Sequence, residues 1–512
     1  MNELGEVRKY SYDLVIIHPG AAHGIYGQLG DQLTAVEPPL WCRLIAGYVI
    51  DRGFSVQIID AEAEGKDPAQ VAVDVFAYRP RLVCLAVYGH QPSASTQQMY
   101  AAGLIAKAIK LMSPALIIMV GGHVSALPER TMKEEAIDFA CVGEGPITIV
   151  GLLEQLVSNQ FDNHFSVTEV PGLVWGPKNK IRVNPSAPLI EDLSQLHGNV
   201  WHKLPMSKYR AHNWQCMDGN PRQPYASVYT TLNCPFACSF CCISAPYQSR
   251  RYFMRDPKEV VTEILFLNRR YGVKTFKIID EMFILNERHY TTICKGLIES
   301  GVADELNIWA YARVDTVKPE TLTMLRQAGF RWLALGIESG SKYVRDGAQK
   351  RLKNDDITSV VRAIQAAGIN VIGNYIFGLP DDDMESMRAT LNLALMLNTE
   401  FANFYSAMAY PGSPLYVQAV KEGWDLPPDW RSFSQHNSDC FPMHSQHLKN
   451  SAILKFRDEA FQIYFSSSVY QHMIRDKFGQ EAVDHINQML RYKLPRKLIE
   501  ATYAPQERAS AH

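Results

Sequence analysis

The chain has 512 residues, too many for one ordinary hydrophobic core, so several domains are expected. Hydrophobic residues make up 47% of the sequence and charged residues 20%, a balance that excludes a largely disordered protein. The 51 basic side chains nearly equal the 53 acidic ones, so no net charge attracts nucleic acid or anionic lipid.

The sequence also lacks the patterns of membrane insertion and export. No run approaches the roughly 20 apolar residues that a membrane-spanning helix needs. Residues 1–10 mix charges without the apolar region of a signal peptide. We therefore expect a cytoplasmic protein without a transmembrane segment.

Residues 12–156 alternate short apolar runs with amphipathic segments. The runs predict parallel strands at 13–18, 55–60, 82–89, 115–122 and 139–143. Segments such as 39–52 and 96–110 are long enough for the crossover helices between such strands. This pattern predicts an N-terminal Rossmann-like domain with a doubly wound parallel sheet.

The remaining chain falls into three parts. Residues 157–220 contain several Pro and Gly turns, which predict a linker with a small hairpin. Residues 221–415 return to strand–helix alternation and predict a partial (β/α)6 TIM-type barrel. Its strands are expected at 226–231, 275–280, 307–313, 332–338, 370–378 and 403–410. Residues 416–512 predict a helical C-terminal region.

Three of the ten cysteines stand in one short loop directly after the first strand of the expected barrel. Cys234, Cys238 and Cys241 can bind three corners of a 4Fe-4S cluster and leave the fourth iron open to an outside ligand. Structural zinc fits less well, because it usually takes four protein ligands in two separated pairs. Cys242 adjoins Cys241 and cannot easily bend onto the same metal.

This cysteine spacing, with the aromatic Phe240 before the last cysteine, resembles the signature of the radical S-adenosylmethionine superfamily. The resemblance implies that the amino and carboxylate groups of S-adenosylmethionine bind the open iron. An electron from the cluster then breaks a carbon–sulfur bond and yields a 5'-deoxyadenosyl radical. A flavodoxin- or ferredoxin-type electron donor is the partner that this chemistry implies.

Polar residues and glycines end the later barrel strands, as expected where loops build an active site. By the same resemblance, Glu281 receives the amino group of the cofactor, unless it only caps a turn. Glu338 and Ser339 suit the ribose diol. Arg313 is expected to bind a carboxylate of the cofactor or substrate, and an ion pair with Glu338 is an equally good interpretation. Gly373 lies in a segment that resembles the adenine site.

The expected strand ends of the N-terminal domain are rich in small and polar residues, which a large flat ligand can approach closely. No G-x-G-x-x-G follows the first strand, so a dinucleotide is disfavoured. The arrangement, with Glu37-Pro38-Pro39-Leu40 before the first helix, resembles the cobalamin-binding domain of one large radical S-adenosylmethionine class. The residues that this resemblance assigns to cobalamin are Gly20, Tyr88, Ser93, Gly121, Gly122, His123, Ser125, Glu144 and Gly145.

One departure concerns the cobalt ligand. The D-x-H-x-x-G motif, which supplies an axial histidine in many cobalamin proteins, is missing, and the D-x-H at 162–164 lacks the glycine. We therefore expect base-off cobalamin without a protein histidine beneath the cobalt. The alternative is that these glycines are only tight turns of a domain that binds nothing.

Together, the two resemblances imply methylation of an unactivated carbon in a small-molecule or lipid substrate. A cobalamin-dependent cyclase or rearrangement enzyme, similar to the anaerobic ring cyclase of bacteriochlorophyll synthesis, is the first alternative. A non-catalytic cobalamin or iron–sulfur sensor is the second and is ranked lower. Aromatic side chains between 461 and 470 favour a hydrophobic core over a substrate channel.

Overall fold

The computed structural model describes residues 10–20, 34–162 and 166–503. The N-terminal sheet has seven strands in the order β2-β1-β3-β4-β5-β6-β7, of which the first five pair in parallel. The strands are β1 (Tyr12–His18), β2 (Val56–Asp60), β3 (Pro80–Ala86), β4 (Leu116–Val120), β5 (Phe139–Cys141), β6 (Leu173–Trp175) and β7 (Arg182–Val183). The five predicted strands are confirmed, and the expected hairpin is β6–β7, which extends this sheet.

Helices cover both faces of this sheet, which confirms the doubly wound fold. α2 (Leu40–Ile50) and α8 (Pro146–Asp162) pack on one face, and α4 (Pro68–Tyr78) and α5 (Ala94–Met112) pack on the other. A capping box between Asp67 and Gln70 starts α4. The shorter helices are α3 (Ala61–Glu64), α6 (Gly122–Ala126) and α7 (Pro128–Glu134).

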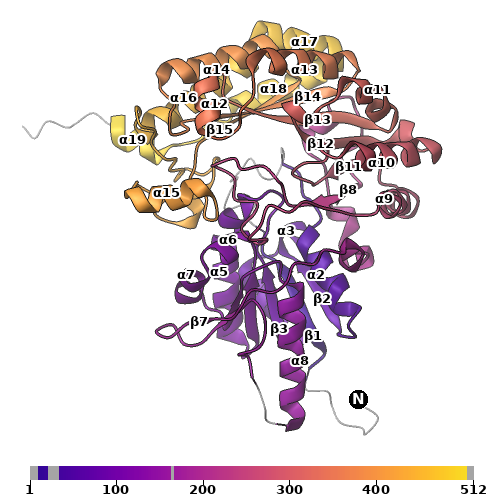
Figure 1. Cartoon of the computed structure of the whole chain (residues 1–512), viewed down its shortest axis with the longest axis vertical. Helices are drawn as coiled ribbons and strands as arrows, with labels where there is room; N and C mark the ends of the chain where they lie inside the picture. Colours follow the sequence, from indigo (N-terminus) through magenta and orange to yellow (C-terminus); the bar gives the residue numbers. More distant parts are fainter. Residues whose placement is uncertain (1–9, 21–33, 163–165, 504–512) are drawn as a thin grey trace, which may run out of the picture.

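The second sheet has six parallel strands in the order β15-β14-β13-β12-β11-β8, an open or partial barrel as predicted. Its strands are β8 (Tyr225–Val228), β11 (Thr275–Ile278), β12 (Asn307–Arg313), β13 (Phe330–Glu338), β14 (Asn370–Phe377) and β15 (Phe401–Ser406). The helices between them are α9 (Pro257–Tyr271), α10 (Glu287–Glu299), α11 (Pro319–Gln327), α12 (Lys342–Gly347), α13 (Asn354–Ala366) and α14 (Met384–Leu397). In Figure 1 this barrel lies above the N-terminal domain.

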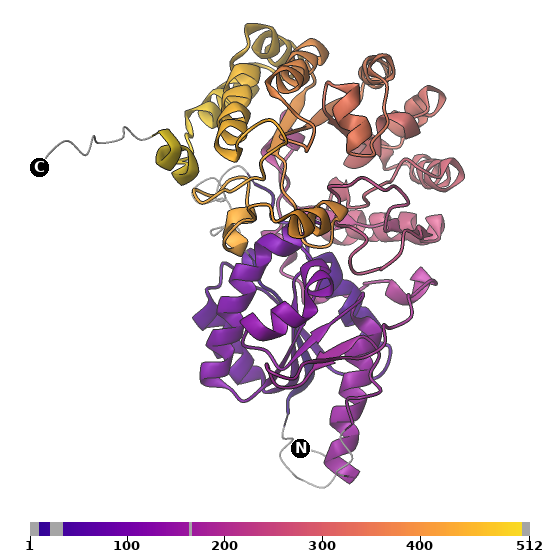
Figure 2. The ribbon, with the colours of Figure 1, turned by 60° about the vertical axis from the view of Figure 1, so that its left-hand side comes forward.

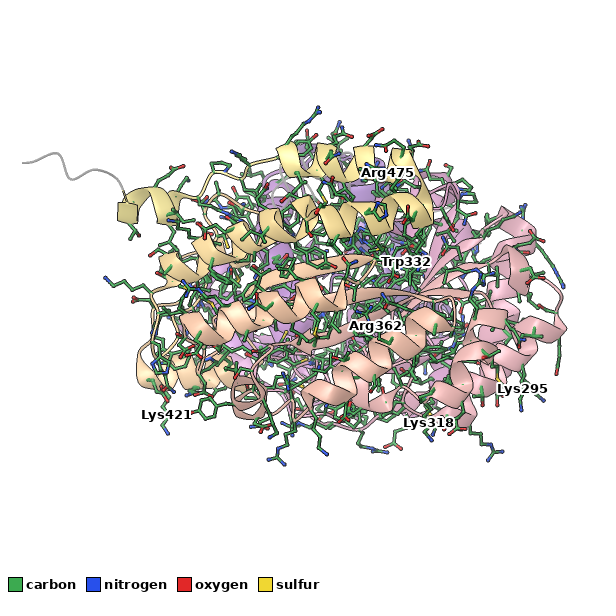
Figure 3. All side chains as sticks on the ribbon, turned by 90° about the horizontal axis from the view of Figure 1, so that it is seen from above. Lys295, Lys318, Trp332, Arg362, Lys421 and Arg475 are labelled. Carbon is green, nitrogen blue, oxygen red and sulfur yellow. The ribbon has the colours of Figure 1, made fainter. Side chains whose placement is uncertain are left out.

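The C-terminal region is helical, as predicted. It contains α15 (Pro414–Glu422), α16 (Asn450–Ser466), α17 (Ser468–Phe478), α18 (Gln480–Arg491) and α19 (Lys497–Tyr503). Tyr464 and Tyr470 are buried against β15, and their hydroxyls donate to the carbonyls of Thr399 at 2.7 Å and Glu400 at 3.1 Å. Seen from above, charged side chains such as Arg475 lie on the outside of the helices, whereas Trp332 lies within (Figure 3). These buried tyrosines belong to the core.

The two sheets are joined by a buried interface. The Arg43 guanidinium of α2 donates to Glu263 of α9 and to the Ser227 carbonyl of β8, each at 3.2 Å, and it stacks on Trp201. Arg255 also pairs with Glu263, at 2.6 Å. One hydrophobic core runs from the N-terminal sheet into the barrel. The segment around α15 lies between the two parts (Figure 2).

The segment between the two sheets packs into the open barrel. The ring of Trp214, from the segment between the sheets, packs edge-on against Trp309 and Trp332 of the barrel strands, with ring centres 5.3 and 5.2 Å away. Gln215 donates to the carbonyls of Phe276 and Asn307, so this segment fills the barrel from one end.

A search of the described helices for a membrane-spanning segment finds none with the required length and hydropathy.

Candidate functional site

The three predicted cluster cysteines lie on one loop between β9 (Thr231–Leu232) and β10 (Phe253–Met254). Asn233 begins this loop in the left-handed region, with φ of 66°. Its side-chain oxygen accepts the Cys234 backbone N–H at 2.8 Å, and its amide donates to two carbonyls farther along the loop. The Cys241 N–H donates to the Cys238 carbonyl at 3.1 Å. These bonds curl the loop, and its thiols are near enough for each of Cys234 and Cys241 to feel the charge of Cys238.

The chemistry of this loop fits an iron–sulfur cluster. Burial raises the pKa of Cys234 to about 11 and the pKa of Cys241 well above its usual range. Metal binding removes such protons, because a thiolate bound to a cation no longer carries an uncompensated buried charge. Residues 234–241 offer three soft sulfur ligands and no carboxylate or imidazole. Cys242 is buried and lines a separate cavity.

Arg313 lies beside the cysteine loop. Its Nη1 is 3.6 Å from the Cys238 Sγ, and its guanidinium lies 3.9 Å from the centre of the Phe236 ring. Asp315 accepts two of its N–H groups at 2.8 and 2.9 Å, and the Lys350 carbonyl accepts another at 2.9 Å. The ion pair with Glu338 that we considered is therefore wrong, because Asp315 takes that place.

Glu338 pairs with Lys350 instead, at 2.8 Å, and both side chains are buried. Glu338 is held in the left-handed region with φ of 66°. A Cβ at Gly336 would lie 2.5 Å from its carboxylate and 2.7 Å from the Lys350 ammonium, so a larger residue there would displace this ion pair. Ser339 lies in the interior, where its hydroxyl is 3.1 Å from the Thr390 hydroxyl. The Ser339 hydroxyl thus contacts α14, on which Thr390 lies.

Glu281 follows β11 and faces a cavity of about 50 Å³ between the domains. Burial raises the pKa of its carboxyl to about 7. The neighbouring Asp280 instead accepts the Thr230 N–H at 2.7 Å and supports the barrel.

The last two residues predicted for S-adenosylmethionine, at positions 373 and 240, have packing roles. A Cβ at Gly373 would lie 2.7 Å from the Tyr375 hydroxyl, so this glycine makes room for the tyrosine side chain. Phe240 packs in the apolar cluster around α15.

Most of the predicted cobalamin residues lie together at the C-terminal edge of the N-terminal sheet, where they bind groups of this same edge. The Tyr88 hydroxyl donates to the Glu144 carbonyl at 2.6 Å, and the Ser125 hydroxyl accepts the Gly143 N–H at 3.1 Å. Nδ1 of His123 is 3.1 Å from the Thr96 hydroxyl. These side chains support the edge from within.

The remaining predicted positions differ in role. The Glu144 carboxylate accepts the Ile190 N–H at 3.0 Å, and burial raises its pKa to about 7. Gly121 has φ of 155°, and a Cβ there would lie 2.0 Å from the Val87 carbonyl oxygen. At Gly122 the nearest atom is 3.6 Å away, so its surroundings are open. Gly20 and Gly145 also have positive φ, and Ser93 precedes α5 without a capping bond.

A larger cavity of about 780 Å³ lies between the N-terminal domain, the barrel interior and the C-terminal helices. Its walls include Glu62 and His90 from the N-terminal domain, Trp309 and Tyr311 from β12, and Phe461 from α16. His90 also lines the small cavity beside Glu281, so the two cavities adjoin. Burial, with nearby His18, lowers the pKa of His90 to about 3, which keeps it neutral at neutral pH.

Sequence reasoning missed several residues of this region. Ser95, rather than Ser93, accepts the His123 N–H at 2.9 Å. Lys277 of β11 is buried and pairs with Glu37 of the other domain at 3.1 Å. No local motif marks either residue; an internal lysine within the short strand β11 is the one available signal for Lys277.

A three-cysteine loop on a partial parallel barrel, docked against the edge of a doubly wound sheet, defines a radical S-adenosylmethionine enzyme with a cobalamin-type domain. Residues 29–153 match the family model for the B12 binding domain, and residues 228–394 match that for the Radical SAM superfamily. The chain belongs to the cobalamin-binding-domain-containing radical S-adenosylmethionine enzymes.

Relatives with similar sequences include enzymes of two reaction types. An uncharacterized methyltransferase from Pyrococcus horikoshii is 27% identical over 84% of this chain and 88% of its own length. The anaerobic magnesium-protoporphyrin IX monomethyl ester cyclase of Cereibacter sphaeroides is 26% identical over 79% of this chain and 63% of its own.

Solved structures share the fold. The radical S-adenosylmethionine methyltransferase TsrM from Kitasatospora setae, with tryptophan substrate bound, has a TM-score of 0.63 at 19% identity, covering 80% of this chain and 76% of that one. The cobalamin-dependent S-adenosylmethionine radical enzyme OxsB, with aqua-cobalamin and S-adenosylmethionine bound, has a TM-score of 0.63 at 14% identity, covering 94% and 72%.

Proposed function

We propose that this enzyme methylates an unactivated carbon of a small-molecule or lipid substrate through a 5'-deoxyadenosyl radical. The observation that carries the proposal is the small cavity between the domains. Glu281 and Cys242 line it from the barrel, and Tyr88 and Gly122 line it from the N-terminal domain. One residue predicted for S-adenosylmethionine and two predicted for cobalamin therefore face the same cavity, which adjoins the larger cavity that suits a substrate.

The protein's own groups have distinct parts in this proposal. When bound, the cluster supplies the electron that cleaves S-adenosylmethionine, and methylcobalamin supplies the methyl group. Cys234, Cys238 and Cys241 hold the cluster, and Glu281 accepts hydrogen bonds from the amino group of S-adenosylmethionine. Trp214 and the C-terminal helices exclude water from the barrel, which protects a reactive radical.

The stoichiometry follows from the atoms exchanged. One substrate, two S-adenosylmethionines and two electrons give methylated substrate, 5'-deoxyadenosine, methionine and S-adenosylhomocysteine. We propose a flavodoxin- or ferredoxin-type protein as the electron source. We also propose that the cobalamin is bound base-off, because the D-x-H-x-x-G motif is missing from the sequence.

The test measures both products of S-adenosylmethionine. Protein loaded anaerobically with iron, sulfide and hydroxocobalamin, which the reductant converts to a form that accepts a methyl group, is given S-adenosylmethionine and a reductant, and products are quantified by mass spectrometry. We expect 5'-deoxyadenosine together with S-adenosylhomocysteine, and we expect Cys238→Ala to abolish the 5'-deoxyadenosine. Fully loaded protein that forms neither product would overturn the proposal.

Cyclisation or rearrangement is the second candidate, favoured by the likeness to the ring cyclases over 79% of this chain. It predicts 5'-deoxyadenosine without stoichiometric S-adenosylhomocysteine. The mass of the product separates the two reactions, because methylation replaces a hydrogen by a methyl group and cyclisation adds no carbon.

A further inference from the structure

Three side chains that can bind a metal meet outside the cysteine loop, at the C-terminal edge of the N-terminal sheet. His18 ends β1, Glu62 lies in α3 directly after β2, and His90 follows β3. One ligand atom of each lies within 4.8 Å of the other two. The strand order β2-β1-β3 makes the three loops neighbours at the point where the order reverses. Sheets of this type bind ligands there. We call these residues the His–Glu–His triad.

The geometry of the triad is close to that of a metal site. Nε2 of His18 is 3.3 Å from a Glu62 carboxylate oxygen, and the ring centres of His18 and His90 are 5.5 Å apart. Gly20 permits this approach, because a Cβ there would lie 2.8 Å from the Glu62 backbone nitrogen. Ligand atoms on one ion at about 2.0–2.2 Å lie roughly 3–3.5 Å apart. The upper limit of 4.8 Å between the ligand atoms means that a bound ion would draw the three side chains closer together.

Its nitrogen atoms lack other partners. His18 is buried, and its Nε2 faces the Glu62 carboxylate at 3.3 Å without a well-aligned hydrogen bond, while neither ring nitrogen of His90 has a hydrogen-bond partner among the residues that the structure describes. An unpaired buried polar group costs about 1–3 kcal/mol, so such groups in a native protein call for an explanation. A single bound cation would satisfy these nitrogens together with the carboxylate.

The other carboxylates near the triad are engaged by other side chains, so Glu62 is the carboxylate that faces the two imidazoles. Glu37 lies 3.9 Å from Nδ1 of His90, but its carboxylate is held by the Lys277 ammonium at 3.1 Å. The Asp60 carboxylate accepts the Tyr209 hydroxyl at 2.8 Å. The adjacent acidic groups are thus engaged by other side chains.

We propose that His18, Glu62 and His90 bind a divalent transition metal ion of the zinc or iron(II) type, separate from the iron–sulfur cluster and from cobalt. Two imidazoles and one carboxylate are a usual ligand set for these ions. Glu62 and His90 also line the 780 Å³ cavity, so the ion keeps open coordination positions toward it. In that position it can polarise a carbonyl or phosphoryl oxygen of a substrate. The site does not depend on which reaction the enzyme catalyses.

The test uses the full-length protein with its cluster and without cobalamin, under anaerobic conditions. The protein is titrated with Zn²⁺, desalted and analysed for zinc and iron per chain. We expect one zinc per chain with the iron content unchanged. His90→Ala and Glu62→Gln should each weaken zinc binding by about 100-fold. His472→Ala is the matched control, because His472 is an exposed histidine 3.3 Å from a carboxylate of Asp476 on α17.

Three outcomes would overturn the proposal. One is zinc that does not saturate at one per chain, and another is binding that neither substitution weakens. The third is stoichiometric release of zinc when hydroxocobalamin is added, which would assign the triad to the cofactor. Circular dichroism and iron content verify the fold of each variant. His90→Asn, which keeps a polar side chain of moderate size, replaces the alanine variant if that one does not fold.

Discussion

The two parallel sheets both present their candidate sites at the C-terminal ends of strands, yet they build them in different ways. In the barrel, three cysteines within eight residues form the cluster loop. In the N-terminal domain, the residues assigned to cobalamin are spread over the loops that follow four strands, and their side chains bind neighbouring groups of the same sheet edge. We call the cysteine loop the local site and the cobalamin residues the distributed site. Loss of one residue should abolish cluster binding at the local site, whereas each substitution at the distributed site should weaken ligand binding only in part.

The largest effect is expected when one ligand of the cluster loop is removed. Cys238→Ala should lose the cluster and lower 5'-deoxyadenosine formation by more than about a thousandfold, or ~4 kcal/mol. Cys294→Ala is the control, because Cys294 is a buried cysteine on α10 of the same barrel that lies outside the cysteine loop and does not line either described cavity. Iron content, cluster absorbance and product formation are measured for both. Equal iron loss in the two variants would contradict the assignment of the three ligands.

The second prediction compares two adjacent glycines of the distributed site. Gly121→Ala should destabilise the protein by roughly 3 kcal/mol, because its Cβ would lie 2.0 Å from the Val87 carbonyl oxygen. Gly122→Ala has no atom nearer than 3.6 Å and should leave stability nearly unchanged. Denaturant unfolding measures both.

Cobalamin binding completes this comparison. If the ligand approaches the backbone at Gly122, the added methyl group should weaken cobalamin binding about tenfold, or ~1.4 kcal/mol. Titration with hydroxocobalamin, followed by absorbance, measures this change. Unchanged affinity in a folded Gly122→Ala variant would show that this glycine is not needed for close approach.

The same contrast explains what the sequence could predict. Apolar runs bounded by turns located all eleven parallel strands of the two sheets, because strand burial is a local pattern. The cysteine spacing likewise revealed the cluster loop. Ion-pair partners were not readable: Arg313 pairs with Asp315, and Glu338 pairs with Lys350. Partner choice depends on loop conformation, here the left-handed backbone at Glu338, which no periodicity encodes.

The residues that join the domains could not be predicted from the sequence either. The sequence around Trp214 gives no sign that its ring packs into the barrel, and the lysine within the short strand β11 does not reveal which carboxylate of the other domain pairs with it. Their role arises only when the N-terminal sheet docks on the barrel. Distributed sites are therefore less predictable than local ones.

The third prediction compares two carboxyls, one in each part, whose pKa burial raises to about 7. If Glu281 must be ionised to bind the amino group of S-adenosylmethionine, its ionised fraction rises from about one tenth at pH 6 to nine tenths at pH 8. Affinity for S-adenosylmethionine should therefore rise about tenfold over this range. Equilibrium binding at several pH values measures it.

The control for this prediction lies in the other domain. Glu281→Gln should remove the pH dependence, whereas Glu144→Gln should leave it, because Glu144 binds the Ile190 backbone instead. A pH dependence that persists in Glu281→Gln would assign the titrating group elsewhere.

The smallest predicted effect concerns the electronic properties of the local site. The Arg313 guanidinium, 3.6 Å from the Cys238 sulfur, carries a positive charge and an N–H donor. Both stabilise the reduced cluster more than the oxidised one, because the reduced form carries one more electron. Arg313→Gln should lower the cluster's reduction potential by on the order of 50 mV, which is ~1 kcal/mol for one electron. Redox titration followed by electron paramagnetic resonance measures the shift.

Arg313→Lys should shift the potential less, since it keeps the charge and loses the planar donor group. Arg431→Gln provides the control, because Arg431 also pairs with an aspartate two residues away, Asp429 at 3.0 Å, but remote from the cysteine loop. If Arg313→Gln keeps its cluster and its potential, the guanidinium only shapes the loop through Asp315. A lowered potential would instead show that the local site is tuned by a residue that lies 72 positions beyond its last cysteine.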